Sequence, residues 1–133
     1  MSAICDAKSA MLVLRGQIEE APEGYPFVAA FLDPQSEVLQ TVVFPGSHTE
    51  VPSAIYAQAE ALGARCVILA VRYQGEREEA IRDLAPDIVE LKRELAEEPL
   101  RGQLMDVLLV KGRNVYSCSE EMEFRLLRRR QIA

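Results

Sequence analysis

The residues best placed for chemistry follow the most apolar stretch of the sequence. The segment 67–76 reads VILAVRYQGE, so a short apolar run leads into an arginine, a tyrosine and, two residues later, a glycine. In open α/β proteins, ligands and metals bind just beyond the carboxyl end of such a buried strand. An arginine beside an aromatic residue can bind a carboxylate or stack on a planar group. Arg72 and Tyr73 are therefore candidate ligand-binding residues; the alternative is that Tyr73 only fills space while Arg72 pairs with a nearby glutamate.

Metal-ligating and nucleophilic side chains are few. His48 is the only histidine, and the three cysteines form no Cys-x-x-Cys pair, which argues against a structural zinc site or a disulfide framework. Ser47 precedes His48, but adjacent residues seldom align a hydroxyl with an imidazole, and no orienting acid can be identified. The acids Glu76, Glu78 and Glu79 are typical of the first turn of a solvated helix, where the helix dipole favours negative charge.

Composition and charge narrow the classes of partner. The 133 residues, 49% hydrophobic and 27% charged, fit one folded domain, 1–133, with a sizeable core. The net charge of -6 disfavours broad nucleic-acid binding, because phosphates would be repelled. Within the C-terminal segment RLLRRR, four arginines are candidates for contact with an acidic partner or with nucleic acid; the alternative is a solvated tail. These four are Arg125, Arg128, Arg129 and Arg130.

No targeting or membrane-spanning segment is expected. The longest apolar run is far shorter than the roughly 20 residues that a membrane span needs. The N-terminal apolar residues follow no basic region and are interrupted by Asp6 and Lys8, unlike a signal peptide. The sequence therefore predicts a cytoplasmic protein.

Apolar runs bounded by turn residues predict five strands. The run 65–71 does not alternate with polar residues, so we expect it to be central and covered on both faces. The segments 27–33 and 38–44 are expected to form a hairpin around the PQSE turn. A second hairpin is expected from 104–110 and 115–118, joined by KGRN.

Helical spacing of apolar residues predicts the remaining elements. One amphipathic helix is expected from Ala7 to Ile18, and another ahead of Gly63, which suits a left-handed helix end. Residues 76–97 have a helical composition, and we expect Pro86 to start a second helix there, because proline disrupts a helix interior. A capping box at Ser117-x-x-Glu120 predicts a final helix. The expected fold class is α/β, a mixed sheet flanked by helices.

Three segments in this order resemble the RadC-type members of the JAB/MPN (JAMM) superfamily. They are PFVAAFLDPQSEVLQTVVFPG, EALGARCVILAVRYQG and LMDVLLVKGRNVYSCSEE. The resemblance implies a cytidine-deaminase-like sandwich in a bacterial protein with a link to DNA repair. It also implies a zinc hydrolase of the isopeptidase or peptidase kind, in which two histidines and an aspartate hold the metal and a glutamate activates its water.

The residues of this chain do not supply that zinc site. The two histidines of the family's His-x-His motif fall on Val71 and Tyr73, and the glutamate falls on Pro26. The aspartate falls on Leu84 by an ungapped count, or on Asp87 if three extra residues are allowed. Valine has no lone pair, and neutral tyrosine is a poor zinc ligand near pH 7. We therefore expect no metal, no cofactor and no catalysis by the family's mechanism.

The sequence thus favours a degenerate member of this superfamily, a pseudoenzyme that acts as a protein-interaction or ligand-binding scaffold. We expect it to bind a protein partner or to form a homo-oligomer. The candidate ligand-binding residues at the former metal position are Arg72, Tyr73, Asp87 and His48. Two alternatives stay open. One is a hydrolase with a reduced metal site built from Asp87 and His48; the other is a DNA-repair-associated nucleic-acid binder that uses the arginine-rich C-terminus.

Overall fold

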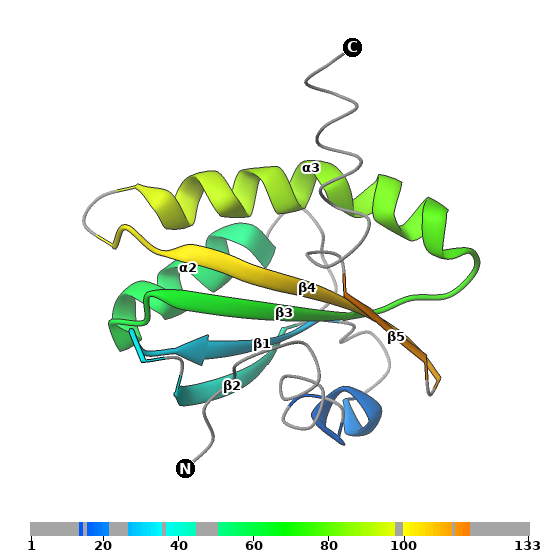
Figure 1. Ribbon diagram of the computed structural model, residues 1–133, viewed down its shortest axis with the longest axis horizontal. Coiled ribbons are helices and arrows are strands. Elements are labelled where there is room, and N and C mark those ends of the chain that lie inside the picture. The colour runs from blue at the N-terminus through cyan, green and yellow to red at the C-terminus, as the bar shows by residue number, and fades with distance from the viewer. Residues whose placement is uncertain are drawn as a thin grey trace.

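The computed structural model describes residues 14, 16–21, 27–35, 37–44, 51–97, 100–112 and 114–117. Residues 16–20 are helical and precede a single mixed sheet (Figure 1). In chain order the elements are β1 (Phe27–Leu32), β2 (Val38–Phe44), α2 (Val51–Leu62), β3 (Cys66–Arg72), α3 (Arg77–Ala96), β4 (Gln103–Lys111) and β5 (Asn114–Ser117). The mixed α/β class predicted from the sequence is confirmed.

The five strands lie in the order β2-β1-β3-β4-β5. β3 and β4 run parallel, and the other neighbouring pairs are antiparallel. The hairpin of β1 and β2 is held at its turn by Asp33, whose Oδ1 accepts backbone N–H groups from Gln35 at 2.9 Å and Glu37 at 3.0 Å. A short polar side chain that bonds the backbone ahead of it is what specifies such a turn.

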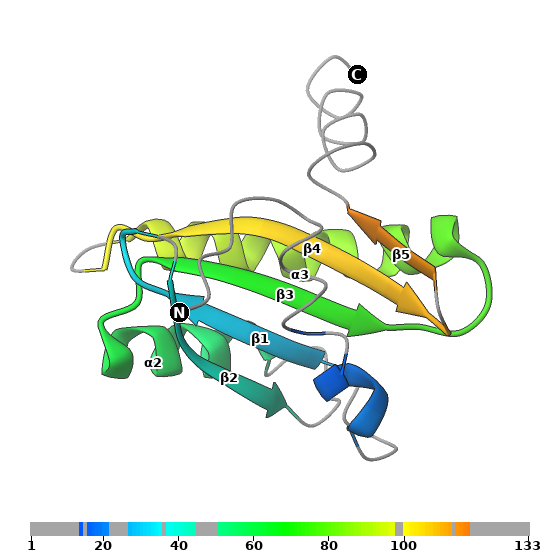
Figure 2. The same ribbon diagram turned by 60° about the horizontal axis from the view of Figure 1, so that its bottom comes forward.

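The sheet separates two apolar layers. Phe27, Leu69 and Leu109 belong to the layer that packs against α2 and α3, which cover one face. Val28, Ile68 and Leu108, their neighbours along the strands, belong to the opposite layer, where Leu14 and Ile18 also pack. Figure 2 shows the sheet with α2 and α3 behind it. Both layers follow from the period-two alternation of side chains along a strand.

β3 is the central strand of the sheet, and apolar side chains cover both of its faces, as its unalternating sequence predicted. Residues 67–71 are all buried, and the strand pairs with β1 on one side and β4 on the other. Gly63, at the end of α2, has φ +67, which confirms the expected left-handed helix end. Because β3 runs antiparallel to β1 and parallel to β4, its carboxyl end lies beside the start of β1 and the carboxyl end of β4.

The expectation that Pro86 starts a new helix is wrong. α3 is one helix from Arg77 to Ala96, with Pro86 inside it. Pro86 is exposed, so water can reach the carbonyl of Arg82, which loses its helical N–H partner. Buried apolar residues continue at helical spacing on both sides of the proline, and their packing outweighs its cost. They are Ile81, Leu84, Ala85, Ile88, Leu91 and Leu95.

Some sequence predictions lie outside the described residues. They include most of the capping box that begins at Ser117, the final helix and the first part of the N-terminal helix. Among the described residues, the helices are too short or too polar to cross a membrane.

Candidate functional site

Arg72 ends β3 and joins it to the N-terminal helical residues. Its Nη1 donates to the carbonyl of Ile18 at 3.0 Å, and its Nη2 donates to the carbonyl of Ala21 at 3.3 Å. These carbonyls belong to the end of the helical residues, where acceptors lack partners within the helix and a positive charge is favourable. The Arg72 guanidinium thus anchors the N-terminal helical residues to the end of the central strand.

Tyr73 lies on the other side of the sheet, because successive side chains of an extended chain alternate. Its backbone N–H continues the ladder by donating to the carbonyl of Val110 at 3.1 Å. Its half-buried ring packs against the apolar layer beneath α3. The Nζ of Lys111 lies 5.8 Å from the ring centroid, so one face of the ring already meets a cation.

A cavity opens at this end of β3. Its volume is about 260 Å³. It is formed by the start of β1, the end of β3 and the first half of α3. The lining residues are Phe27, Val71, Arg72, Tyr73, Gln74, Glu79, Ala80, Asp83 and Leu84. The structure therefore brings Arg72 and Tyr73 together at one cavity, at the position where the sequence predicted a ligand site.

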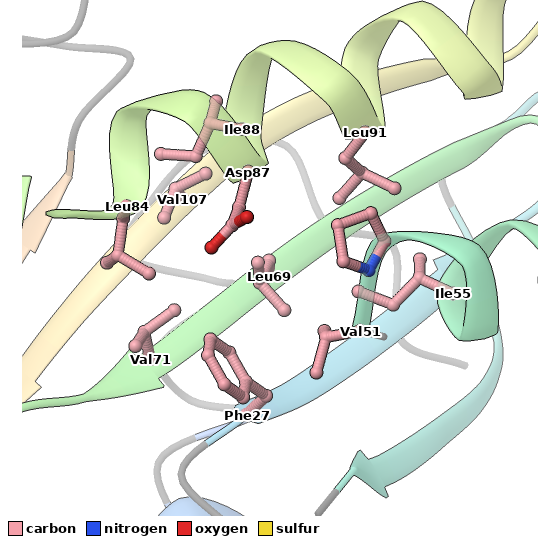
Figure 3. A pocket seen from close by; sticks show the side chains of 11 residues that line it. Phe27, Val51, Ile55, Leu69, Val71, Leu84, Asp87, Ile88, Leu91 and Val107 are labelled. Atoms are coloured by element: carbon pink, nitrogen blue, oxygen red, sulfur yellow. The ribbon is translucent and has the colours of Figure 1, made fainter. Parts of the chain in front are cut away.

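Asp87 lines a second, apolar pocket that adjoins the first and shares Phe27, Val71 and Leu84 with it. Figure 3 shows the Asp87 carboxylate directed from α3 toward Leu69 of β3, among side chains of α2 and the sheet. This pocket has a free volume of about 10 Å³, about the least that can hold one water molecule. Asp87 is therefore not among the residues that line the larger cavity.

Glu79 and Asp83 are the acids that line the larger cavity, and sequence reasoning missed them as site residues. The signal was present: Glu79, Asp83 and Asp87 recur every four residues, and this spacing places side chains in one row along a helix. The two on the cavity are exposed at its mouth, whereas Asp87 is half-buried. The ion pairs of Arg93 with Glu90 and Glu97 lie further along α3.

Cations and aromatic rings also meet at this end of the sheet. The Arg77 guanidinium, at the start of α3, lies 4.1 Å from the centroid of the Tyr116 ring on β5. Lys111 donates through Nζ to the carbonyl of Gly75 at 2.5 Å, which ties the loop after β3 to the end of β4. Gly75 has φ +82, a conformation that side chains rarely adopt.

The residues at the expected metal position do not fit a zinc ion. Val71 is 3% exposed within the apolar layer, and Tyr73 packs against the same layer. The described part of the chain contains no group of three or more His, Cys, Asp and Glu side chains that could hold a metal. His48 and the four C-terminal arginines lie outside the described residues, so their roles stay predictions.

Comparisons with protein-family models and with curated proteins find no match for this chain.

Proposed function

We propose that this chain is a RadC-like JAB/MPN domain that has kept an α/β scaffold, has lost the zinc chemistry, and binds a ligand or protein partner. One observation carries the proposal: the two positions that would need imidazoles hold Val71 and Tyr73, whose side chains belong to the apolar packing beneath α3. The five-stranded mixed sheet with helices is compatible with such a scaffold. The cavity beside these residues supplies a place for a ligand.

Metal content tests the loss of chemistry. Protein purified without a histidine tag is dialysed against zinc and then against metal-free buffer, and its zinc is measured by mass spectrometry. We expect far less than one zinc ion per chain. Stoichiometric zinc that is lost in His48→Ala or Asp87→Asn would overturn the proposal in favour of a reduced metal site. Stoichiometric zinc that persists in both variants would indicate another metal site and would also contradict the proposal.

The edge of the sheet supports a role in protein association. β2 is an edge strand of seven uncharged residues, VLQTVVF, and it pairs with β1 alone among the described strands. Edge strands of monomeric proteins are usually protected by charges, proline or a covering segment, since a bare edge pairs with other chains. Leu39 on this strand is 46% exposed. We infer that a second copy of this chain adds a strand at this edge.

Sedimentation tests this association, and the chain offers a matched control. Leu39→Lys places a charge on the edge strand, whereas Val89→Lys places one on α3, where Val89 is 45% exposed. We expect concentration-dependent self-association of the wild-type chain that Leu39→Lys weakens and Val89→Lys leaves unchanged. A wild-type chain that stays monomeric at high concentration, or equal effects of the two variants, would refute association through β2.

Salt-dependent binding of DNA or RNA that disappears on truncation after Phe124 would instead favour the nucleic-acid alternative.

A further inference from the structure

The cavity at the carboxyl end of β3 has an apolar floor and a polar mouth. Phe27, Val71 and Leu84 are buried and form the floor, and the half-buried ring of Tyr73 adds an aromatic wall. Glu79 and Asp83, both exposed, stand at the mouth on α3. The volume of about 260 Å³ is below the range of roughly 300–1,000 Å³ typical of sites for drug-sized ligands. The space suits one side chain better than a nucleotide.

We propose that this cavity binds a basic side chain of a partner peptide, an aliphatic stem that ends in a guanidinium or ammonium group. The inference rests on the proposed function, because it takes the site as one of binding rather than catalysis. The stem would pack on the apolar floor, as the stems of arginine and lysine commonly do. The charged end would reach the carboxylates of Glu79 and Asp83, which stand one helical turn apart.

The chemistry of the two carboxylates favours a guanidinium in particular. Carboxylates accept paired N–H groups from a guanidinium, and such charge-assisted bonds are stronger than neutral ones. A planar cation also stacks well on an aromatic ring such as that of Tyr73, which lines the cavity.

Arg72 is the one lining residue of opposite charge. Its Nη1 and Nη2 donate to the carbonyls of Ile18 and Ala21, which directs the guanidinium toward the N-terminal helical residues. Two carboxylates, those of Glu79 and Asp83, line the cavity, while the single lining guanidinium is already held by these two carbonyls. The cavity is therefore complementary to a positive ligand.

An NMR titration of the full chain tests the proposal with two probes of nearly equal shape. N-acetyl-argininamide carries the guanidinium, and N-acetyl-citrullinamide replaces it with a neutral urea group. We expect saturable shifts of residues that line the cavity with the arginine probe, and binding about tenfold weaker with the citrulline probe, equivalent to roughly 1.4 kcal/mol. Glu79→Gln and Asp83→Asn should each weaken binding of the arginine probe roughly threefold to tenfold.

Glu78→Gln is the matched control, because Glu78 is an exposed acid of the same helix that does not line the cavity. It should leave the affinity unchanged at moderate salt. Equal binding of the two probes, shifts outside the cavity, or equal losses in Glu78→Gln and Glu79→Gln would overturn the proposal. Binding of N-acetylglycinate in preference to the arginine probe would overturn it too and would indicate an anion site at Arg72. None of these outcomes depends on zinc, so this inference can fail while the proposed loss of zinc chemistry stands.

Discussion

Ser117 donates a hydrogen bond through Oγ to Oδ2 of Asp106 at 2.5 Å, and the bond links the edge strand β5 to β4. Asp106 is 6% exposed, and its Oδ1 accepts the N–H of Val107 at 2.7 Å. Ser117→Ala removes a donor from a buried carboxylate and should lower the free energy of unfolding by about 1–3 kcal/mol. Urea unfolding measures this change.

Ser53→Ala is the control for that prediction. The Ser53 hydroxyl lies 3.4 Å from Glu94 Oε1 at an exposed position, so its loss should change stability by less than about 0.5 kcal/mol. If both alanine variants unfold at the same urea concentration, the Asp106 carboxylate does not depend on Ser117.

Gly102, just before β4, should not tolerate a side chain. A Cβ at this position would lie 2.7 Å from the carbonyl oxygen of Arg65. That oxygen accepts the N–H of Gln103 at 2.8 Å, and Gly102 donates its own N–H to the carbonyl of Leu95 at 2.6 Å, so the backbone is held from both sides. Gly102→Ala should lower the free energy of unfolding by about 1–3 kcal/mol, measured by chemical denaturation.

Gly16→Ala provides the comparison, because a Cβ at Gly16 would meet nothing within 4 Å. Gly16 is helical, so alanine should be neutral or stabilise the protein by up to about 1 kcal/mol. A Gly102→Ala variant as stable as Gly16→Ala would contradict the close approach of Gly102 to Arg65.

Cys66 should react slowly with alkylating reagents. Burial raises the pKa of its thiol, the Asp33 carboxylate raises that pKa further, and Arg65 lowers it. Since the thiolate is the nucleophile, iodoacetamide should modify Cys66 more slowly in the folded chain than in urea at the same pH. The rate is measured by mass spectrometry in a chain that carries Cys5→Ser and Cys118→Ser.

The same shift links stability to pH. The thiol has a higher pKa in the folded chain than in the unfolded chain, so the folded state holds the proton more tightly. The contribution of the protonated thiol to stability is therefore present at neutral pH and is lost as the pH rises through the raised pKa. Asp33→Asn keeps the oxygen that accepts the turn N–H groups but removes the charge, so it should speed alkylation. An unchanged rate in Asp33→Asn would show that the carboxylate has no effect on the thiol.

The sequence predicted the elements whose signals are local. The unalternating run before Arg72 indicated the central strand, and Asp33 lies at the turn that its neighbours predicted. The prediction that Pro86 starts a second helix was wrong because it used only a local rule against proline in helices. The packing of Leu84 and Ile88, which stabilises α3 across the proline, is a tertiary interaction.

The contacts of the site depend on residues far apart in the chain. Arg72 bonds to carbonyls more than 50 residues earlier, and no local pattern names such partners. Glu79 and Asp83 line the cavity because α3 packs over the end of β3, and their spacing in the sequence alone does not specify that packing. Side-chain type and spacing thus predicted a site at the end of β3, while the packing of α3 on the sheet determines which acids line that site.

The register of β3 can be tested by introducing histidines at the two positions where the resemblance to the JAB/MPN superfamily implies them. Val71 and Tyr73 lie two residues apart and pack on the same side of the sheet, toward α3, so Val71→His together with Tyr73→His would place two imidazoles on one face. Asp83 or Asp87 on α3 could then supply a carboxylate, and two imidazoles with one carboxylate form a common catalytic zinc site. We expect the double variant to bind about one zinc ion per chain, measured by calorimetry, and each single variant to bind much more weakly. Asp83→Asn and Asp87→Asn in the double variant would identify the third ligand through the larger loss of affinity. A double variant that stays folded by circular dichroism but binds zinc no better than the single variants would show that the ends of β3 and α3 do not have the superfamily's arrangement.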